Sequence, residues 1–358
     1  MQNNEQAVYN AIAQHFHCDK RRIKFIAYLM VALLKLANAS LADWSLAINQ
    51  PTQRTSRYKR LQRFIGQFHF SARLYAQIVW QRYGQGREVV LTLDRTEYQQ
   101  GQQWMQLLVL GIAHQQMSIP LIWHSANRHG NSPVLARKVL LRLFTKWIQP
   151  TDKQVVYITA DREFVGPEFR TCGLIPVIRI RANAQVRTPQ GKPQRVSALF
   201  DCPQWRLLRK PRRLYKANLY LAGKRLADGD FLIVYSLTYL PHIARLYAQR
   251  WGIETLFGAY KSRGFDLEQC RVQQHKRLRT LLFVLSMGLI WAIETGSWLI
   301  NKGIAIACRV VASISRQVYS LFRHGLDELR DRCLNQRPIE DLIPLLSCLK
   351  ARESKHTG

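Results

Sequence analysis

The hydrophobic pattern changes period near residue 87, from helical to strand spacing. In the first 85 residues, IAYLMVALLKLANASLADWSLAI repeats apolar positions every three to four residues, which predicts helices. After that, REVVLTLDRTEY, WMQLLVLGIAH and SIPLIWHSA are short apolar runs separated by turn residues, which predicts an antiparallel meander. VLARKVLLRLFTKWI returns to the helical period, and two more strands, QVVYITADREF and IPVIRIRA, flank a short helix at PEFRTCGL.

The predicted order βββ-α-β-α-β is that of an RNase H-like α/β core. Gly and Pro turns separate β-prone runs between residues 184 and 240, so we expect an inserted β-rich domain there. After Glu254 the pattern is expected to stay helical to the end. The expected domains are a helical DNA-binding domain (1–85), the catalytic core (86–183 and 241–275), the inserted domain (184–240) and a helical C-terminal region for dimerisation or DNA contact (276–358).

Two apolar runs are long enough to be tested as membrane spans. The run from Phe25 to Ala39 is interrupted by Lys35, and the 13-residue run from Leu281 to Ile293 is followed by Glu294. Both fall short of the ~20 apolar residues that a span needs. We therefore expect buried core helices and no membrane partner, and the polar start MQNNEQAVYN does not have the pattern of a signal peptide.

The net charge of the chain indicates which class of molecule it binds. The 358 residues carry 53 Lys and Arg against 23 Asp and Glu, a net charge of +30. Such an excess repels itself unless a polyanion is bound, and nucleic acid fits better than an anionic membrane surface. The seven cysteines are scattered without a C-x-x-C pair, which fits a reducing cytoplasm. The His15–Cys18 cluster could bind a metal, but it lacks a second ligand pair, so ordinary helix residues are favoured.

Two basic segments are expected to contact DNA. The first is a basic amphipathic helix after a turn, which suits a helix-turn-helix, although a solvated helix of a small bundle has the same pattern. The second, in the inserted domain, interleaves cations with aromatic residues, as phosphate contact and base stacking require, although a solvated hairpin is the alternative. The candidate residues are Arg57, Lys59, Arg60 and Arg63 in the first segment, and Trp205, Arg209, Lys210, Arg212 and Arg213 in the second.

The segment LYAQRWGIETLFGAYKSRG contains the spacing Y-x2-R-x3-E-x6-K. On one α-helix, its four residues Tyr247, Arg250, Glu254 and Lys261 would fall within roughly 60° of one another. A carboxylate between two cations is ordinarily a salt bridge, and Glu254 could simply pair with Arg250 four residues earlier. Two further acids change that interpretation.

Asp94 and Asp161 each follow a predicted strand directly, and Glu254 lies on a later helix. Separately, Asp94 could cap a turn and Asp161 a helix. Together, three carboxylates would repel unless a cation neutralised them, and oxygen ligands suit Mg²⁺. Two such ions about 4 Å apart can activate a nucleophilic oxygen and stabilise a leaving oxygen in phosphodiester displacement.

On these motifs the chain resembles the DDE transposases of the bacterial insertion-sequence family with the YREK signature. All four signature positions match, and the Asp motifs match in LTLDRTEY and ITADREF. The resemblance covers residues 85–270 with specific motifs. It implies that Asp94, Asp161 and Glu254 hold two Mg²⁺ or Mn²⁺ ions, and that Tyr247, Arg250 and Lys261 contact phosphates of the transposon end.

The resemblance further implies a cut-and-paste reaction on double-stranded DNA by a homodimer in a synaptic complex, in the bacterial cytoplasm near the nucleoid. In related members the freed 3′-hydroxyl forms a hairpin that water then opens. Trp205 is our candidate for stacking a flipped base, with a core role as the alternative. Arg95 and Arg162, each directly after an Asp, could touch DNA or brace the carboxylates.

Two rival functions remain at this stage. One is a metal-dependent DNA nuclease with the same core that does not join strands. The other is a non-catalytic DNA-binding protein, which is disfavoured because binding alone needs no cluster of acids; an RNA-binding protein is disfavoured for the same reason.

Overall fold

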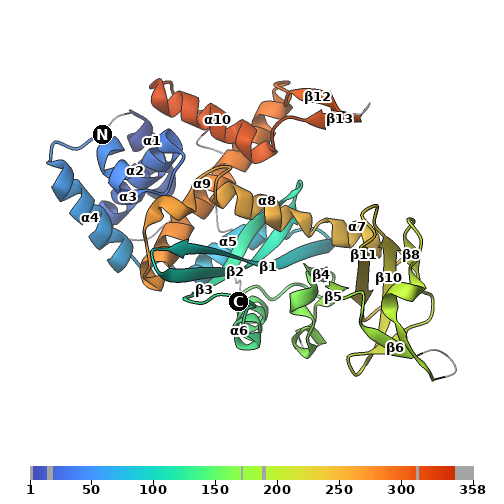
Figure 1. The fold of residues 1–358 in the computed structure, drawn as a ribbon. Helices are drawn as coiled ribbons and strands as arrows, with labels where there is room; N and C mark the ends of the chain where they lie inside the picture. Colours follow the sequence, from blue (N-terminus) through green and yellow to red (C-terminus); the bar gives the residue numbers. More distant parts are fainter. Residues whose placement is uncertain (1–2, 14–18, 171, 188–190, 312–313, 343–358) are drawn as a thin grey trace, which may run out of the picture.

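The computed structural model describes residues 3–13, 19–170, 172–187, 191–311 and 314–342, and its fold is mixed α/β (Figure 1). One nine-stranded sheet has the order β3-β2-β1-β4-β5-β11-β10-β8, with β9 paired to β10. Helices α8 and α9 lie on one side of the first strands and α6 on the other (Figure 1). The His15–Cys18 cluster lies outside the described residues.

The first half of the sheet is a meander followed by two parallel strands. Strand β1 pairs antiparallel with β2, β2 pairs antiparallel with β3, and β1 pairs parallel with β4, which pairs parallel with β5. These elements are β1 (Glu88–Gln100), β2 (Gln103–His114), β3 (Met117–Ala126), α6 (Val134–Trp147), β4 (Val155–Ala160) and β5 (Ile175–Ile180). Helix α6 supplies the crossover that a parallel pair requires. The short helix expected at PEFRTCGL is one turn of 3₁₀ helix, Pro167–Arg170.

The N-terminal region is helical, as its periodicity predicts. Its helices are α1 (Asn3–Ala13), α2 (Lys20–Leu36), α3 (Leu41–Ala47), α4 (Arg54–Gln67) and α5 (Ala72–Tyr83). Asp19, Ser40 and Ser71 each accept a backbone N–H bond at the start of α2, α3 and α5, which satisfies donors that the first turn leaves free. The apolar run in α2 is buried inside the protein.

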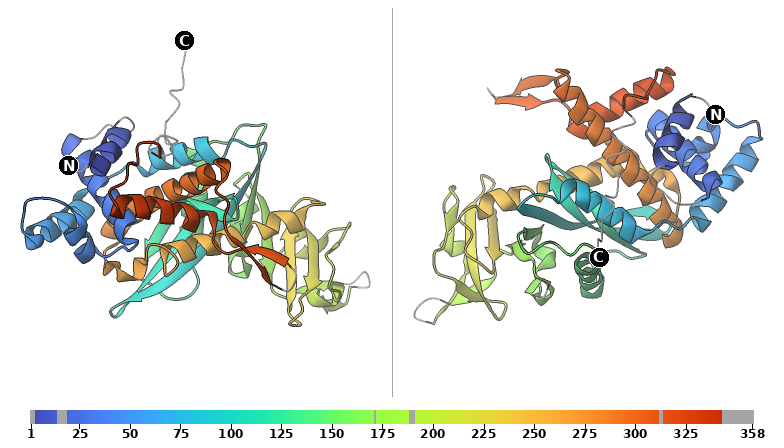
Figure 2. Two further views of the ribbon diagram at one scale, coloured as in Figure 1. Left: turned by 90° about the horizontal axis from the view of Figure 1, so that it is seen from above. Right: turned by 180° about the vertical axis from the view of Figure 1, so that it is seen from behind.

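Residues 185–236 form strands that are mostly joined to the central sheet. Strand β11 pairs antiparallel with β5, and β10 pairs with β11, so the sheet continues from the core into this segment without a break. The strands are β6 (Gln185–Arg187), β7 (Pro193–Arg195), β8 (Arg206–Leu207), β9 (Arg212–Leu214), β10 (Ala217–Arg225) and β11 (Phe231–Ser236). Figure 2 shows these strands and the N-terminal helices at opposite ends of the molecule.

The C-terminal region differs from the all-helical expectation. Helix α9 (His275–Asn301) is followed by the hairpin strands β12 (Cys308–Val311) and β13 (Ile314–Gln317), and only then by α10 (Leu321–Leu334). The hairpin sequence contains β-branched residues in succession, which favour an extended backbone over a helix. Most of PIEDLIPLLSCLK, from residue 343 onward, lies outside the described residues.

Helix α9 is also the element to test for membrane insertion. Within the described residues it is the one single helix long and apolar enough to span a bilayer, and 94% of its apolar window is buried inside the protein. Helices α2 and α3 pass the same test only as a pair bent by 101°. Because its sides are covered by protein, α9 acts as a core helix against which α2, α4 and α10 pack.

Gly325 permits the close crossing of α10 over α9. A Cβ atom at this position would lie 1.8 Å from the carbonyl oxygen of Ala292, which is backbone and cannot rotate away. We predict that Gly325→Ala lowers the free energy of unfolding by about 3 kcal/mol, the upper range for overpacking. The matched control is Gly66→Ala, where the added Cβ would meet the Arg277 side chain at 3.4 Å.

Since Gly66 lies inside helix α4, its replacement by Ala should raise stability by about 0.5–1 kcal/mol. Urea denaturation of both variants measures the two effects. Equal stability of Gly325→Ala and the parent chain would show that α10 does not dock on α9 as described.

Candidate active site

Two carboxylates lie side by side because β1 and β4 are parallel neighbours. In this pair Leu93 is opposite Ala160, so Asp94 and Asp161 occupy the next position on each chain. The sequence pattern predicted Asp94 at the end of its strand. The structure instead continues β1 to Gln100, since the pairing with β2 extends to Gln100 opposite Gln103. Asp94 therefore lies within the strand, where it pairs with Val109 of β2 and directly follows the last position that pairs with β4.

Asp94 is a largely enclosed carboxylate whose side chain is 18% exposed. The Arg95 backbone N–H donates to Asp94 Oδ1 at 2.8 Å, and Arg250 Nη1 donates to Oδ2 at 3.2 Å. Burial raises the pKa of Asp94 to about 6, the Arg95 N–H and Arg250 oppose the rise, and Asp161 and Glu163 add to it. The site thus favours either a proton or another cation at Asp94.

Asp161 has a carboxylate oxygen that is buried without a hydrogen-bond partner. This atom, Oδ1, lies 4.0 Å from Arg179 Nη1, which is beyond hydrogen-bonding range. Asp161 stands just before a one-turn 3₁₀ helix (Arg162–Phe164), yet its side chain makes no capping bond there. The structure therefore does not show the helix-capping role that the sequence left open for Asp161. A buried oxygen of this kind is suited to a cation ligand.

Glu254 comes from a helix that lies against the first strands of the sheet. It is on α8 (Trp251–Tyr260), and Arg250 Nη2 donates to Glu254 Oε1 at 2.6 Å. The same guanidinium reaches Asp94, so Arg250 joins the first and third acids of the site, Asp94 on β1 and Glu254 on α8. The i,i+4 salt bridge between Arg250 and Glu254, expected as the simple alternative, is present. The same guanidinium also contacts Asp94 on β1.

The four signature residues do not lie on one helix. Helix α7 (Ile243–Ala248) ends before Gln249, Arg250 precedes α8, and Lys261 follows it. Tyr247 is buried under Arg250, whose guanidinium carbon is 5.8 Å from the ring centre. Burial raises the pKa of Tyr247 to about 12, so its hydroxyl keeps its proton at neutral pH.

Lys261 belongs to a different set of contacts. Its Nζ donates to the Glu97 carbonyl at 2.8 Å and lies 3.2 Å from Glu268 Oε1. The predicted continuous stripe is therefore wrong in its geometry, because the break at Gln249 and the turn after Tyr260 redirect the two ends. Tyr247, Arg250 and Glu254 remain together, whereas Lys261 lies beside the continuation of β1.

The donor set fits a hard divalent cation in its chemistry. The surroundings of Asp94 favour a bound cation, and Asp161 Oδ1 is a buried oxygen without a hydrogen-bond partner. Among the described residues, no group of three or more His, Cys, Asp or Glu side chains converges closely enough to hold one ion. Glu254 is instead engaged by Arg250, so its carboxylate would have to exchange partners to join Asp94 and Asp161.

Comparison with known proteins identifies the family of the chain. A family model described as the transposase DDE domain matches residues 86–291, more than half of the chain. The chain belongs to the DDE transposase domain family. No curated protein matches it. Among solved structures, the piggyBac transposase synaptic complex with hairpin DNA is similar at 12% identity and a TM-score of 0.44, over 99% of this chain and 83% of that chain. That likeness is too distant to transfer the role of any residue.

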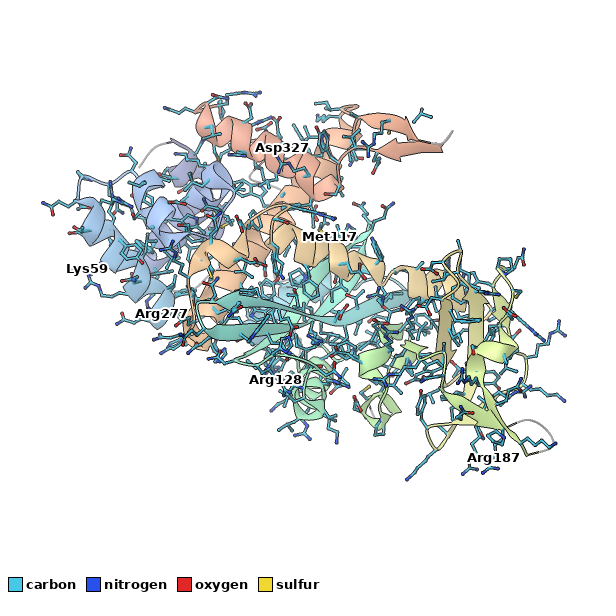
Figure 3. All side chains as sticks on the ribbon, in the orientation of Figure 1. Lys59, Met117, Arg128, Arg187, Arg277 and Asp327 are labelled. Atoms are coloured by element: carbon cyan, nitrogen blue, oxygen red, sulfur yellow. The ribbon has the colours of Figure 1, made fainter. Side chains whose placement is uncertain are left out.

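The basic residues proposed from the sequence occupy two ends of the transposase. Lys59 is exposed on α4 (Figure 3), as is Arg63 on the same helix. Arg209, Lys210 and Arg213 are exposed between β8 and β10. Arg57 and Arg212 are only partly exposed. Arg57 also donates to the carbonyls of Ile48 and Gln50, so it helps to close the turn before α4.

Arg60 and Trp205 are likewise engaged within the protein. Arg60 donates to Gln50 Oε1 at 3.0 Å and lies over Phe25, with its guanidinium carbon 5.2 Å from the ring centre. Trp205 is half-buried against the small apolar cluster beneath α7, and Lys224 Nζ lies 5.9 Å from its ring centre.

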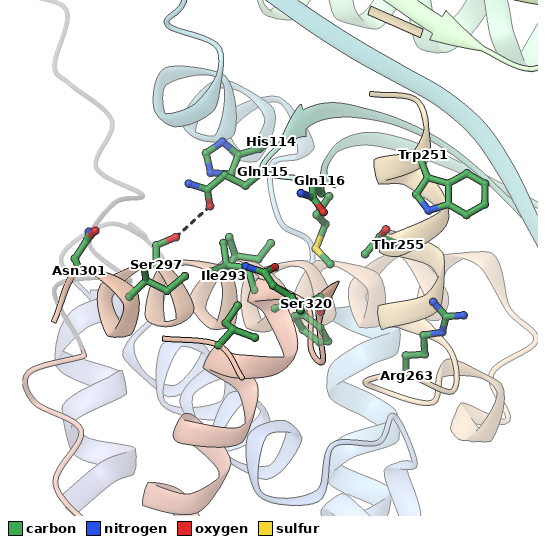
Figure 4. A pocket seen from close by; sticks show the side chains of 16 residues that line it. His114, Gln115, Gln116, Trp251, Thr255, Arg263, Ile293, Ser297, Asn301 and Ser320 are labelled. Carbon is green, nitrogen blue, oxygen red and sulfur yellow. Dashed lines mark hydrogen bonds between the residues drawn. The ribbon is translucent and has the colours of Figure 1, made fainter. Parts of the chain in front are cut away.

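A cavity beside α8 does not include the three carboxylates. It has a volume of about 560 Å³ and lies between α8, the β2–β3 turn and the C-terminal region (Figure 4). Trp251, which is 64% exposed, lines it together with Thr255 and Arg263, and its described lining contains no acid. The cavity therefore has no part in binding a metal ion, and the acids lie outside it.

The sequence analysis missed Glu97 and Glu163 as members of the site. Arg95 Nη1 lies 2.9 Å from Glu97 Oε2, and Arg95 Nε lies 2.6 Å from Glu163 Oε2. The available signal was the spacing, because an acid follows each Asp by two or three residues. The Arg95 side chain therefore pairs with these two glutamates, while Arg162 is exposed, and the roles that the sequence left open for both arginines stay predictions.

The raised pKa of Asp94 predicts a pH-dependent cost to stability. The folded-state pKa of about 6 exceeds the reference value of 3.8, so folding favours the protonated form and stability is lost as pH rises through 6. In EDTA at pH 7.5, Asp94→Asn should raise the free energy of unfolding by up to about 3 kcal/mol, and the gain should fall to about half at pH 5.

Urea denaturation at the two pH values measures this effect. The matched control is Asp327→Asn on α10, whose carboxylate is half-exposed and pairs with Arg323. If Asp94→Asn is less stable than the parent chain at pH 7.5 in EDTA, burial does not disfavour the charged form of Asp94, and this description of the site is wrong.

Proposed function

We propose that this chain is a DNA transposase that cuts the ends of a mobile element and joins them to target DNA. The single observation that supports this most is the register of β1 and β4, in which Asp94 and Asp161 each directly follow the last paired position of two adjacent parallel strands. Glu254 approaches them through Arg250. Three acids from two strands and a helix are the set that metal-dependent phosphodiester chemistry requires.

The sheet order supports an RNase H-like core as the scaffold of this site. Three antiparallel strands are followed by two strands parallel to the first, in the spatial order β3-β2-β1-β4-β5. The segment 184–240 is then an insertion between β5 and α7 that lengthens the same sheet through β11 and β10. We propose that this extension carries DNA along its exposed arginines.

In the proposed reaction Asp94, Asp161 and Glu254 would hold two Mg²⁺ or Mn²⁺ ions, which activate the attacking oxygen and stabilise the leaving oxygen when bound. Water attacks the scissile phosphorus, the P–O3′ bond breaks, and the 3′-hydroxyl is released. That hydroxyl then attacks a second phosphorus, either on the opposite strand to form a hairpin or in target DNA, and the P–O3′ bond at that phosphorus breaks to release a new 3′-hydroxyl.

The remaining signature residues would hold the phosphate backbone. Arg250 has two donor edges that can engage phosphate oxygens bidentately, and Lys261 supplies a point charge. Tyr247 keeps its hydroxyl proton and can donate a hydrogen bond. Moving Arg250 from Glu254 to a phosphate would release that carboxylate for metal binding. Trp205 is proposed to stack an extruded base, which requires it to exchange its contact with Lys224.

The proposed partners are the inverted repeats, target DNA and a second copy of the chain in a synaptic complex, in the bacterial cytoplasm near the nucleoid. The net charge of +30 supports the DNA partner, because each phosphate contact releases counterions. A nuclease that cuts without joining strands uses the same site, and the products distinguish the two functions.

The test is cleavage of labelled DNA taken from the ends of the element that carries the gene, in Mg²⁺ and in Mn²⁺. We expect a nick, then a hairpin that migrates slowly on a denaturing gel. Asp94→Asn, Asp161→Asn and Glu254→Gln should each reduce cleavage by at least about a thousandfold while end binding stays within about threefold, because the acids act on the reaction and not on the duplex.

The matched control is Glu88→Gln, an acid at the start of β1 that pairs with Arg245 and His242 away from Asp94. Cleavage without joined products would favour the nuclease. Undiminished cleavage by a pure Asp161→Asn preparation would refute the assignment of the site.

A further inference from the structure

Arg95 is held by carboxylates on both edges of its guanidinium. Its Nε donates to Glu163 Oε2 at 2.6 Å and its Nη1 donates to Glu97 Oε2 at 2.9 Å, and its side chain is only 19% exposed. An arginine bound in this way has its planar donors already directed, and little of it faces solvent. Its geometry suits a bracing role between carboxylates rather than contact with a phosphate.

Glu163 links the two strands that carry the aspartates. Glu163 lies two residues after Asp161, and Arg95 directly follows Asp94. The ion pair between Arg95 and Glu163 therefore connects β1 beside Asp94 with the segment that follows β4. The other oxygen of Glu163 accepts from the Ser132 backbone N–H at 3.2 Å and from Ser132 Oγ at 2.8 Å. Both carboxylate oxygens are therefore fixed.

The bridge also ties down the loop between β3 and α6. Gly130 N donates to Glu97 Oε2 at 3.2 Å, and His129 Nε2 lies 3.5 Å from Glu97 Oε1. Buried Arg137, on α6, donates through Nε to Ser132 Oγ at 3.0 Å. Three separate segments thus meet at the pair of Arg95 and Glu163.

We propose that Arg95, through Glu163, is a positioning residue that sets the separation and orientation of Asp94 and Asp161 for divalent-metal binding. This proposal rests on the proposed function, in which those two aspartates are metal ligands. Residues that hold ligands in place commonly change metal affinity by about 10- to 100-fold when they are removed.

Positioning and simple electrostatics predict opposite effects for one variant. Arg95→Gln removes a positive charge near the aspartates, so Coulomb attraction alone would strengthen the binding of a divalent cation. If Arg95 positions the ligands, the same change weakens binding. Glu163→Gln keeps the side-chain shape and removes the ion pair, so it should weaken binding by a similar factor.

The experiment measures Mn²⁺ binding to the full chain by the electron paramagnetic resonance signal of free Mn²⁺, first without DNA. We expect Arg95→Gln and Glu163→Gln each to weaken Mn²⁺ binding at least about tenfold, and the double variant to be no weaker than the poorer single one. Arg95→Lys should recover part of the loss, because Lys offers one point charge in place of two directed edges.

The matched control is Arg82→Gln. Arg82 makes a comparable pair with Glu294, at 2.7 Å, between α5 and α9 and away from the aspartates. This variant should bind Mn²⁺ as the parent chain does. Thermal unfolding of each variant identifies any that fails to fold, and Glu163→Gln, which preserves the volume of the side chain, then carries the test.

Three results would overturn the proposal. The first is Mn²⁺ affinity that is unchanged or increased in Arg95→Gln. The second is parent-chain binding of Mn²⁺ that Asp161→Asn leaves intact. The third is a loss of salt-dependent DNA binding in Arg95→Gln with normal Mn²⁺ affinity, which would make Arg95 a phosphate contact. If Mn²⁺ binding weakens as expected but the parent chain cuts no DNA, the positioning role stands and the proposed function fails.

Discussion

The parallel pairing of β1 with β4 brings two carboxylates together, because Asp94 and Asp161 each directly follow the last paired position, Leu93 opposite Ala160. Burial of Asp94 raises the free energy of the fold, and the like charge of Asp161 adds to the cost, in keeping with the raised pKa of Asp94. The neighbouring structure offsets this cost with cations. Arg250 approaches Asp94 from the helical side, and Arg95 pairs with the neighbouring acids Glu97 and Glu163. The arrangement of the surrounding elements follows from the need to balance these acids.

Arg250 shows how the helical layer is adapted to that need. On a single long helix, Tyr247 and Lys261 would both face the same position on the strand. The break between α7 and α8 lets Arg250 lie over Tyr247 while its two donor edges reach Asp94 and Glu254. Gly252 then allows α8 to approach β3, because a Cβ there would lie 2.8 Å from the backbone of Met117. The third acid thus depends on a close helix–sheet contact.

Periodicity and motif spacing predict the helical start, the strand sequence from β1 to β5, and the three acids with their attendant Arg. Other features depend on long-range packing, which local patterns do not encode. The helix break at Gln249 and the pairing of β11 with β5 are of this kind. The β12–β13 hairpin was hidden by its polar and basic neighbours, although its β-branched residues favour strands. The role of Arg95 needed the position of Glu163, which only the fold supplies.

The central claim is that residues 94, 161 and 254 together hold divalent metal. Fe²⁺ can replace Mg²⁺ at such sites, and with ascorbate and hydrogen peroxide it generates radicals that cut the nearby polypeptide backbone. With end DNA bound, the account predicts fragments from cuts near Asp94, Asp161 and Glu254, all suppressed by excess Mg²⁺ and absent in Asp161→Asn. Cuts at other positions, or cuts that Mg²⁺ does not suppress, would contradict it.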